Sequence, residues 1–171
     1  MKHYSLLLGI ALIASTACSQ SAIEQRPWQE ARTLVPISKT AEAITGAITL
    51  SRNSDPASKQ AAMNMTFAKG TTVTLLSEGT SRQSWGRPDA EPQEAEIFRL
   101  SRNPGILENN NTLCGGEQPE QQIYAVFSEN SLFGPPPALT LTVFQSAEPP
   151  FDINSPGLCG TFSYELSPVA P

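Results

Sequence analysis

Histidine is almost absent from this chain of 171 residues, because the only one, His3, stands third in the sequence. Histidine is the usual general base for a serine or cysteine nucleophile and the commonest protein ligand of catalytic zinc. If the N-terminal segment is removed by processing, as argued below, a Ser-His-Asp triad, a Cys-His pair and a histidine zinc site are all excluded. Phosphate-binding glycine motifs are also absent. We therefore expect a protein that is not an enzyme and has neither a metal nor a cofactor.

Basic residues are few. The chain has 11 Lys and Arg against 16 Asp and Glu, which gives a net charge of −5 and a pI near 4.9. A nucleic-acid binder needs a clustered basic surface to contact phosphates. The composition therefore predicts that nucleic acid is not a partner.

Long apolar runs are missing as well. The longest run, residues 6–14, has nine apolar residues, whereas a transmembrane helix needs about 20. Lys2 precedes the run, and the small residues Ser15, Thr16 and Ala17 follow it. This order of basic, apolar and small residues is typical of a secretory signal. We expect residues 1–17 to be a signal peptide and the mature protein to be exported.

The expected cleavage site leaves two alternatives open. Thr16-Ala17-Cys18 resembles the end of a bacterial lipoprotein signal, in which the cysteine becomes the lipidated first residue. Ser15 departs from that pattern, where Leu, Val or Ile is usual, and ordinary cleavage after Ala17 would leave a soluble periplasmic protein. We favour lipidation of Cys18, with several acyl chains giving firm membrane attachment. Ser19 then resembles the sorting signal for the outer membrane, facing the periplasm.

The other two cysteines stand in matched contexts. Cys114 and Cys159 both lie in a Leu-Cys-Gly sequence. Because exported proteins mature in oxidising compartments, we expect these two residues to form a disulfide. Lipidation would account for the third cysteine, Cys18.

The pattern of apolar residues predicts an all-β domain. From about residue 43 onward, apolar and polar residues alternate in short segments, separated by clusters of Gly, Pro, Asn and Ser. Seven strands are expected, at residues 44–50, 63–67, 71–75, 96–101, 122–128, 138–145 and 160–166. We predict a single antiparallel sandwich or small barrel over residues 43–171, preceded by a lipid-anchored tether over residues 18–42. The alternation does not distinguish a sandwich from a barrel.

Three groups of residues are candidate sites. Carboxylates crowd residues 89–96, but a turn-like, solvated acidic loop explains them better than a glycosidase pair. Residues 152–157 match part of a calcium loop, but Pro156 is wrong for one, so we interpret this segment as an Asx and Pro-Gly turn. The third candidate is a binding surface at Trp85 and Arg87, since Trp and Arg are favoured at protein interfaces. The alternative is that Trp85 folds back onto the sheet.

The C-terminal half resembles a family of small uncharacterised exported proteins of Gram-negative bacteria. The resemblance is carried over roughly 60 residues by Leu-Cys-Gly at 113–115 and by Leu-Cys-Gly-Thr-Phe-Ser-Tyr-Glu at 158–165. It implies export, a disulfide and a compact β domain, but no activity that could be transferred to this chain.

Three functions fit these observations. The first is a non-enzymatic envelope lipoprotein that binds an unknown envelope protein or ligand. The second is an inhibitor or immunity protein that acts on a cell-wall hydrolase, for which an acidic surface is suitable. The third is a small barrel that carries an apolar ligand, although seven strands fall short of the roughly eight that such a barrel needs. Its cavity would be lined by Met63, Met65, Phe67, Phe144 and Phe162.

Overall fold

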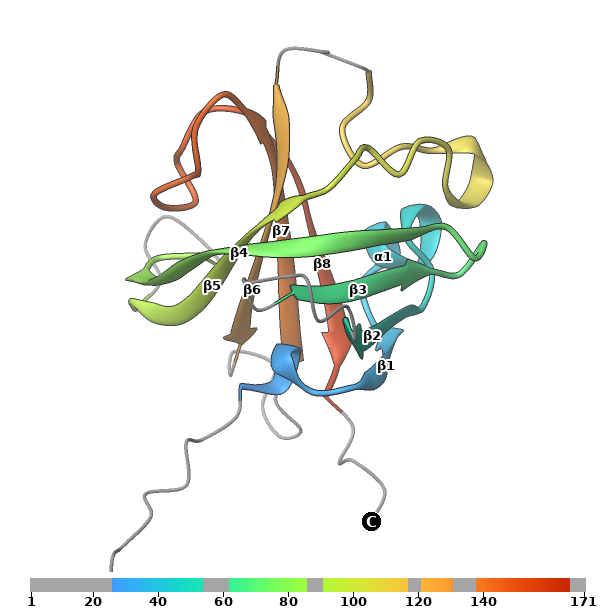
Figure 1. The fold of residues 1–171 in the computed structure, drawn as a ribbon, viewed down its shortest axis with the longest axis horizontal. Helices are drawn as coiled ribbons and strands as arrows, with labels where there is room; N and C mark the ends of the chain where they lie inside the picture. The colour runs from blue at the N-terminus through green and yellow to red at the C-terminus, as the bar shows by residue number, and fades with distance from the viewer. Residues whose placement is uncertain (1–25, 54–61, 86–90, 117–120, 131–137, 167–171) are drawn as a thin grey trace, which may run out of the picture.

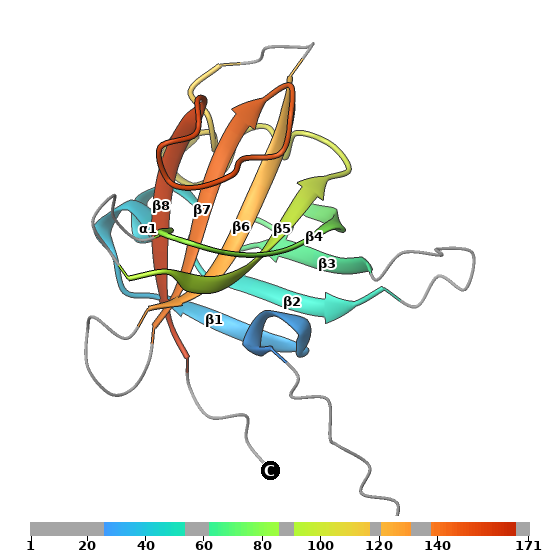
Figure 2. The same cartoon turned by 90° about the vertical axis from the view of Figure 1, so that its left-hand side faces the viewer.

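The computed structural model describes residues 26–53, 62–85, 91–116, 121–130 and 138–166. Eight antiparallel strands form a closed barrel in which each strand pairs with the next in sequence and the last pairs with the first. The strands are β1 (Arg32–Pro36), β2 (Ile48–Arg52), β3 (Ala62–Phe67), β4 (Thr72–Gln83), β5 (Gln93–Leu100), β6 (Gln122–Asn130), β7 (Ala138–Ser146) and β8 (Leu158–Glu165). Three short helices accompany them: η1 (Pro27–Gln29), α1 (Lys39–Ile44) and η2 (Glu108–Asn110). The prediction of an all-β fold is confirmed, and the barrel is the correct alternative (Figures 1 and 2).

The sequence predicts about seven strands and a tether over residues 18–42, and the structure adds an eighth strand, β1, within that segment. This strand pairs with both β2 and β8 and closes the barrel. Only Leu34 within it is fully buried, whereas Val35 is half exposed. A strand with a single inward apolar side chain shows no alternation, and its pairing across the sheet fixes its place instead.

The segment between β1 and β2 also differs from the prediction, because Ile44 ends a helix rather than starting a strand. Ser38 precedes α1 and its Oγ accepts a hydrogen bond of 3.2 Å from the backbone N–H of Ala41. This is the usual N-terminal cap of a helix. Ala41 is fully buried and fixes the helix on the barrel.

β4 is longer than predicted. The expected strand ends at residue 75, whereas β4 continues through a polar segment to Gln83 and pairs there with the first half of β5. The register shifts between Ser77 and Gly79, and Gly79 has a φ of +125°. A glycine adopts this conformation without the steric cost of a side chain. The bulge lets a polar stretch remain paired, which an alternation pattern does not reveal.

The barrel interior is filled by its own side chains. Alternate residues of every strand point inward and form one continuous hydrophobic cluster, as expected for a small barrel. The inward side chains include Leu34, Ile48, Leu50, Met63, Met65, Phe67, Val73, Leu75, Phe98, Leu100, Ile123, Ala125, Phe127, Leu139, Leu141, Val143, Phe162 and Tyr164. Phe98 and Phe127 meet edge to face within it, with ring centroids 5.9 Å apart. A packed interior of this kind provides most of the stability of the fold.

The two ends of the barrel differ. The described chain begins at η1 and finishes after β8 at one end, the lower end in Figure 1. The connections between β5 and β6 and between β7 and β8 project from the other end. A disulfide joins the β5–β6 connection to the start of β8 at this end, so we call it the disulfide end.

Candidate functional site

The disulfide end is organised by the predicted bond between Cys114 and Cys159, which is confirmed. Their Cα atoms lie 4.9 Å apart and the bond spans 45 positions of sequence. Cys114 follows η2 in the β5–β6 connection, whereas Cys159 is the second residue of β8. The bond therefore holds an irregular connection to a strand of the barrel wall.

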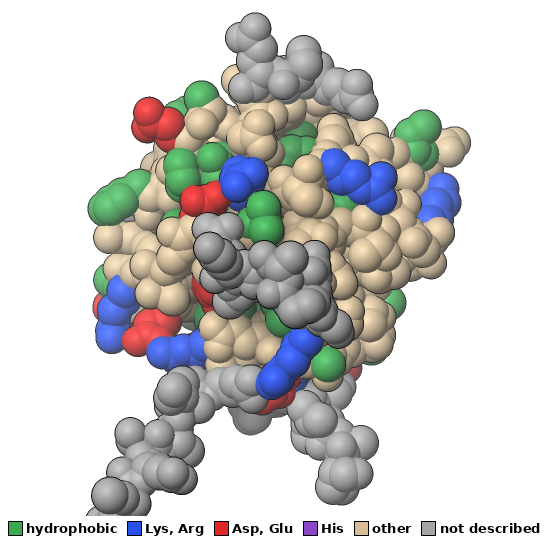
Figure 3. Space-filling view, in the orientation of Figure 1, with side chains coloured by type: hydrophobic (Ala, Val, Ile, Leu, Met, Phe, Trp, Pro, Cys, Tyr) green, Lys and Arg blue, Asp and Glu red, His purple; other side chains and the backbone are tan. Residues whose placement is uncertain are grey.

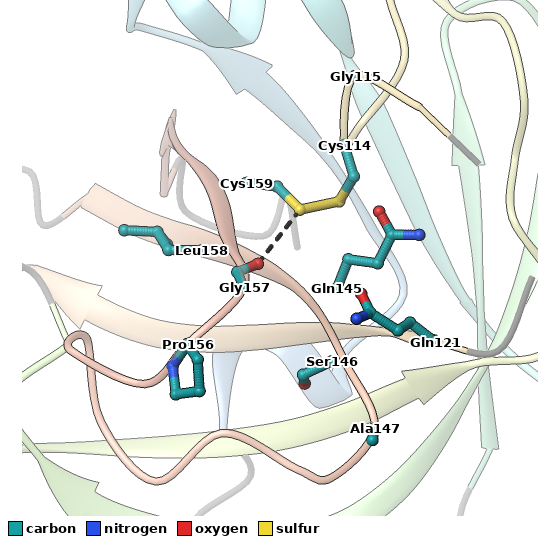
Figure 4. A pocket seen from close by; sticks show the side chains of 10 residues that line it. All are labelled: Cys114, Gly115, Gln121, Gln145, Ser146, Ala147, Pro156, Gly157, Leu158 and Cys159. Carbon is teal, nitrogen blue, oxygen red and sulfur yellow. Dashed lines mark hydrogen bonds between the residues drawn. A yellow bond between two sulfur atoms is a disulfide. The ribbon is translucent and has the colours of Figure 1, made fainter. Parts of the chain in front are cut away.

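A cavity of about 560 Å³ lies beside the disulfide (Figure 4). The described residues of its walls are uncharged and come from the end of β7, the β7–β8 connection, the start of β8 and the β5–β6 connection. They are Cys114, Gly115, Gln121, Gln145, Ser146, Ala147, Pro156, Gly157, Leu158 and Cys159. Gln145 and Ser146 come from β7, and the backbone N–H of Gln145 donates a hydrogen bond of 2.8 Å to the carbonyl of Gly157. Amide and hydroxyl groups of this kind hold neutral polar ligands but supply no general acid or base.

The β7–β8 connection, residues 147–157, is held in shape by its own hydrogen bonds. Ser155 Oγ accepts from the backbone N–H of Phe151 at 2.8 Å and of Asp152 at 3.1 Å. Asp152 Oδ1 accepts from the N–H of Asn154 at 2.8 Å. The predicted Asx turn at residues 152–157 is therefore confirmed. Phe151, at the start of this turn, is 67% exposed.

The predicted binding surface at Trp85 was wrong for that residue. Trp85 is completely buried and meets the ring of Phe144 edge to face, with centroids 6.2 Å apart. Together with Ala95, Tyr124 and Val126, these rings form a second hydrophobic cluster on the outer face of β5, β6 and β7. The alternative, in which Trp85 folds back on the sheet, is the correct one. Arg87 lies outside the described residues.

The same outer face carries buried hydroxyl groups. The side-chain oxygens of Ser128, Thr140 and Thr142 and the Nε1 of Trp85 are buried, and none of them has a hydrogen-bond partner among the described residues. Ser128 on β6 lies directly opposite Thr140 on β7. Buried hydroxyls of this kind are usual positions for internal water.

The carboxylates of residues 89–96 take separate roles where they are described. Glu96 is only 5% exposed, and its Oε2 accepts hydrogen bonds of 2.8 Å from the side chains of Trp28 and Gln29. Ser77 Oγ donates to the other oxygen at 2.6 Å. Glu94 is exposed and forms an ion pair with Arg26. Glu94 and Glu96 thus have different partners, Glu91 is exposed, and Asp89 lies outside the described residues.

A smaller cavity of about 320 Å³ lies next to these groups. It is lined by Arg26, Trp28, Thr80, Ser81, Arg82, Glu94 and Ala95. Its one acidic side chain is the Glu94 that pairs with Arg26. Across the described ranges, no group of three or more His, Cys, Asp or Glu side chains is placed to hold a metal ion.

Two buried tyrosines are the groups with perturbed pKa values. Burial raises the pKa of Tyr164, and its hydrogen bond of 2.6 Å with Thr45 Oγ1 offsets part of that rise. Burial also raises the pKa of Tyr124, and the negative charge of Glu78 adds to the rise. Both hydroxyls therefore stay neutral at physiological pH.

The surface shown in Figure 3 has no field of a single charge. Lys and Arg side chains are interspersed with Asp and Glu side chains, and apolar groups emerge at several points between them. In the described part of the chain, no helix is long and apolar enough to cross a membrane. Cys18 and the predicted signal peptide lie outside the described residues, so lipidation stays a prediction.

Comparison with known proteins gives no match: no family model, curated protein or solved structure is similar to this chain. The resemblance of the C-terminal half to uncharacterised exported proteins therefore rests on its sequence pattern alone. Two features of the site were missed from the sequence. Glu96 was grouped with a solvated loop, although its alternation with Phe98 and Leu100 could have placed it inward. Phe151 was not singled out, because no local pattern shows that an aromatic residue in a turn is exposed.

Proposed function

We propose that this protein is an exported cell-envelope lipoprotein whose barrel is a non-enzymatic domain for binding another envelope protein. The observation that carries the proposal is the separation of the two barrel ends. The described chain enters at η1, at the end opposite the disulfide (Figure 1). A chain anchored through Cys18 would approach that entry end. The disulfide end, with its cavity and its cross-linked connections, would then face away from the membrane and meet a partner.

The filled interior supports binding at the outside of the barrel. Met63, Met65, Phe67 and Phe162 are at most 7% exposed and belong to the main core cluster. Phe144, expected beside them, lies in the outer cluster instead. The two described cavities are also lined from the barrel ends and rim.

A carrier of an apolar ligand is the second candidate, and one observation favours it. The barrel has eight strands, which is about the smallest number that can enclose a small ligand. Such a ligand would have to displace side chains that now pack against one another. An inhibitor of a cell-wall hydrolase is a special case of the binding domain, with the hydrolase as partner.

Intact mass measurement on protein isolated from its native envelope tests the anchor. We expect a chain that begins at Cys18 and carries diacylglycerol and a further acyl chain, and that gains about 2 Da, two hydrogen atoms, when the disulfide is reduced. The variant Cys18→Ser should lose the lipid and leave the membrane fraction. An unmodified wild-type chain would overturn the lipoprotein part of the proposal.

Native and denatured masses of the same preparation separate the two candidate functions. The binding domain predicts no small molecule in the interior, so the mass of the chain should be the same in both states. A small apolar molecule that is released only on denaturation would instead support the second candidate function, a carrier of an apolar ligand.

A further inference from the structure

We propose that Phe151 is the anchor through which the disulfide end docks, inserting into an apolar pocket of a basic partner protein. This inference rests on the proposed binding function and names the contact residue and the chemistry of the partner. Phe151 is the most exposed large apolar side chain among the described residues, at 67%. Aromatic residues are enriched in the buried centres of protein interfaces, because a large rigid ring buries much area for little lost freedom.

The loop that carries Phe151 is already fixed in shape. The backbone N–H of Phe151 donates to Ser155 Oγ, which also accepts from Asp152. The N–H of Ser155 in turn donates to the carbonyl of Asp152 at 3.1 Å. Ordering a flexible loop on binding costs free energy. This cost is smaller for a loop that its internal hydrogen bonds already hold in one conformation.

Buried residues on both sides hold the loop to the barrel. Pro150 is buried immediately before Phe151, and Ile153 is buried two residues after it, at 7% exposure. The backbone N–H of Ile153 donates a hydrogen bond of 3.1 Å to the carbonyl of Ser84. The fold therefore buries residues on both sides of Phe151 and leaves this ring in solvent.

A second exposed apolar side chain follows this connection, at the start of β8. Leu158, where β8 begins, is 47% exposed and lines the cavity beside the disulfide. Cys159 follows it directly and ties this strand to the β5–β6 connection. Phe151 on the β7–β8 connection and Leu158 at the start of β8 are thus two exposed apolar groups close in sequence to the disulfide.

The charges of the loop indicate which kind of partner would bind it. From Ser146 to Leu158 the only charged side chains are Glu148 and Asp152, one on each side of Phe151. An anionic membrane would repel them, and two copies of the chain meeting through this loop would bring four carboxylates together. A protein whose apolar pocket is bordered by Lys or Arg fits both the ring and its charges. A basic hydrolase of the cell wall belongs to this class.

The test uses the full-length protein in its native envelope, with a photo-crosslinking phenylalanine analogue at position 151. The matched control position is Val35, a half-exposed apolar residue on β1. We expect a protein adduct from position 151 and none from position 35. Mapping of the crosslinked peptide should place it at apolar residues of the partner that have Lys or Arg nearby.

Binding to the purified partner then measures the contribution of each group. We expect Phe151→Ala to weaken the affinity at least about tenfold, and Val35→Ala to change it less than about twofold. Glu148→Gln combined with Asp152→Asn should slow association and reduce its dependence on salt. Asn at position 152 keeps the oxygen that accepts from Asn154, so the turn is preserved. Equal melting temperatures for all variants exclude unfolding as the cause.

The remaining outcomes overturn the inference in different ways. A crosslink from position 151 to lipid or to a second copy of this chain would show that Phe151 does not bind a basic partner protein. An unaltered affinity in Phe151→Ala would show that the ring is not an anchor. A partner adduct from position 35 and none from 151 would overturn the role of Phe151 while the binding function stands. Absence of adducts from both positions would count against the binding function itself.

Discussion

The indole Nε1 of Trp28 donates a hydrogen bond of 2.8 Å to Oε2 of Glu96, across 68 positions of sequence. Trp28 is 2% exposed and belongs to the main core cluster. This bond attaches η1, the first described element of the chain, to the barrel wall at β5. The segment through which the predicted tether reaches the domain is therefore part of the folded structure.

Substitutions at Glu96 should show how much this attachment contributes. Glu96→Leu leaves one buried and two partly buried donors without an acceptor and should lower the free energy of unfolding by about 3 kcal/mol or more. Glu96→Gln keeps one acceptor oxygen and should cost about 1–2 kcal/mol. Glu94→Gln is the control and should cost less than about 1 kcal/mol, because its ion pair with Arg26 is exposed to solvent. Urea unfolding measures all three, and equal effects would contradict the attachment.

The two buried tryptophans form a matched pair for a second prediction. Nε1 of Trp28 is hydrogen-bonded to a carboxylate, whereas Nε1 of Trp85 is without a partner in the described structure. Trp28→Phe and Trp85→Phe both remove similar volume. Because a bond to a charged group contributes about 1.5–3 kcal/mol, Trp28→Phe should be the more destabilising by roughly that amount. Thermal unfolding of the two variants provides the comparison, and a larger effect at Trp85 would refute it.

Removal of the disulfide should destabilise the domain strongly. The bond closes a loop of 45 positions between Cys114 and Cys159, for which chain entropy predicts about 4 kcal/mol. The double variant Cys114→Ser, Cys159→Ser should therefore melt well below the wild type. Reduction of the wild-type protein should lower its melting temperature similarly and leave the variant unchanged. Equal melting temperatures for wild type and variant would contradict this expectation.

Alanine substitutions at Gly157 and Gly70 distinguish the effect of backbone strain from that of steric overlap. Their φ angles are nearly equal, +86° and +85°, so an alanine is strained by a similar amount at either position. A Cβ at Gly157 would overlap the carbonyl oxygen of Gln145, whereas a Cβ at Gly70 meets nothing within 4 Å. Gly70→Ala should cost about 1 kcal/mol, and Gly157→Ala distinctly more. Chemical denaturation of both variants tests the difference, which an equal loss would disprove.

The buried hydroxyl of Tyr164 predicts a loss of stability in alkaline solution. Its pKa in the folded protein is raised above the value of about 10 in the unfolded chain. Above pH 10 the unfolded state releases this proton more readily than the folded state does. The contribution of Tyr164 to the free energy of unfolding is therefore fully present below that pH and is lost as the pH rises further. The slope contributed by this residue is at most about 1.4 kcal/mol per pH unit. Tyr164→Phe should remove this part of the slope in urea titrations between pH 9 and 11, and an unchanged profile would exclude the assignment.

The sequence by itself determined the features that depend on neighbouring residues. Alternation over Met63, Met65 and Phe67 predicted β3 and its inward face, since side chains of a strand alternate between its two sides. The matched contexts of Cys114 and Cys159 predicted the disulfide. Asp152 with Pro156 and Gly157 predicted a turn, because these residues act within a few positions of one another.

Only the tertiary structure decided the features that depend on distant pairing. β1 is a strand because β2 and β8 lie on either side of it, and its pairing with β8 makes the sheet a closed barrel. Glu96 is buried because Trp28 and Ser77 bring donors to it from two other elements. Two aromatic residues in polar segments differ in burial. Trp85 is buried because it packs against the ring of Phe144, whereas Phe151 is exposed. Burial of a side chain in a loop is set by which surface the loop is held against, and that surface is assembled from strands far away in sequence.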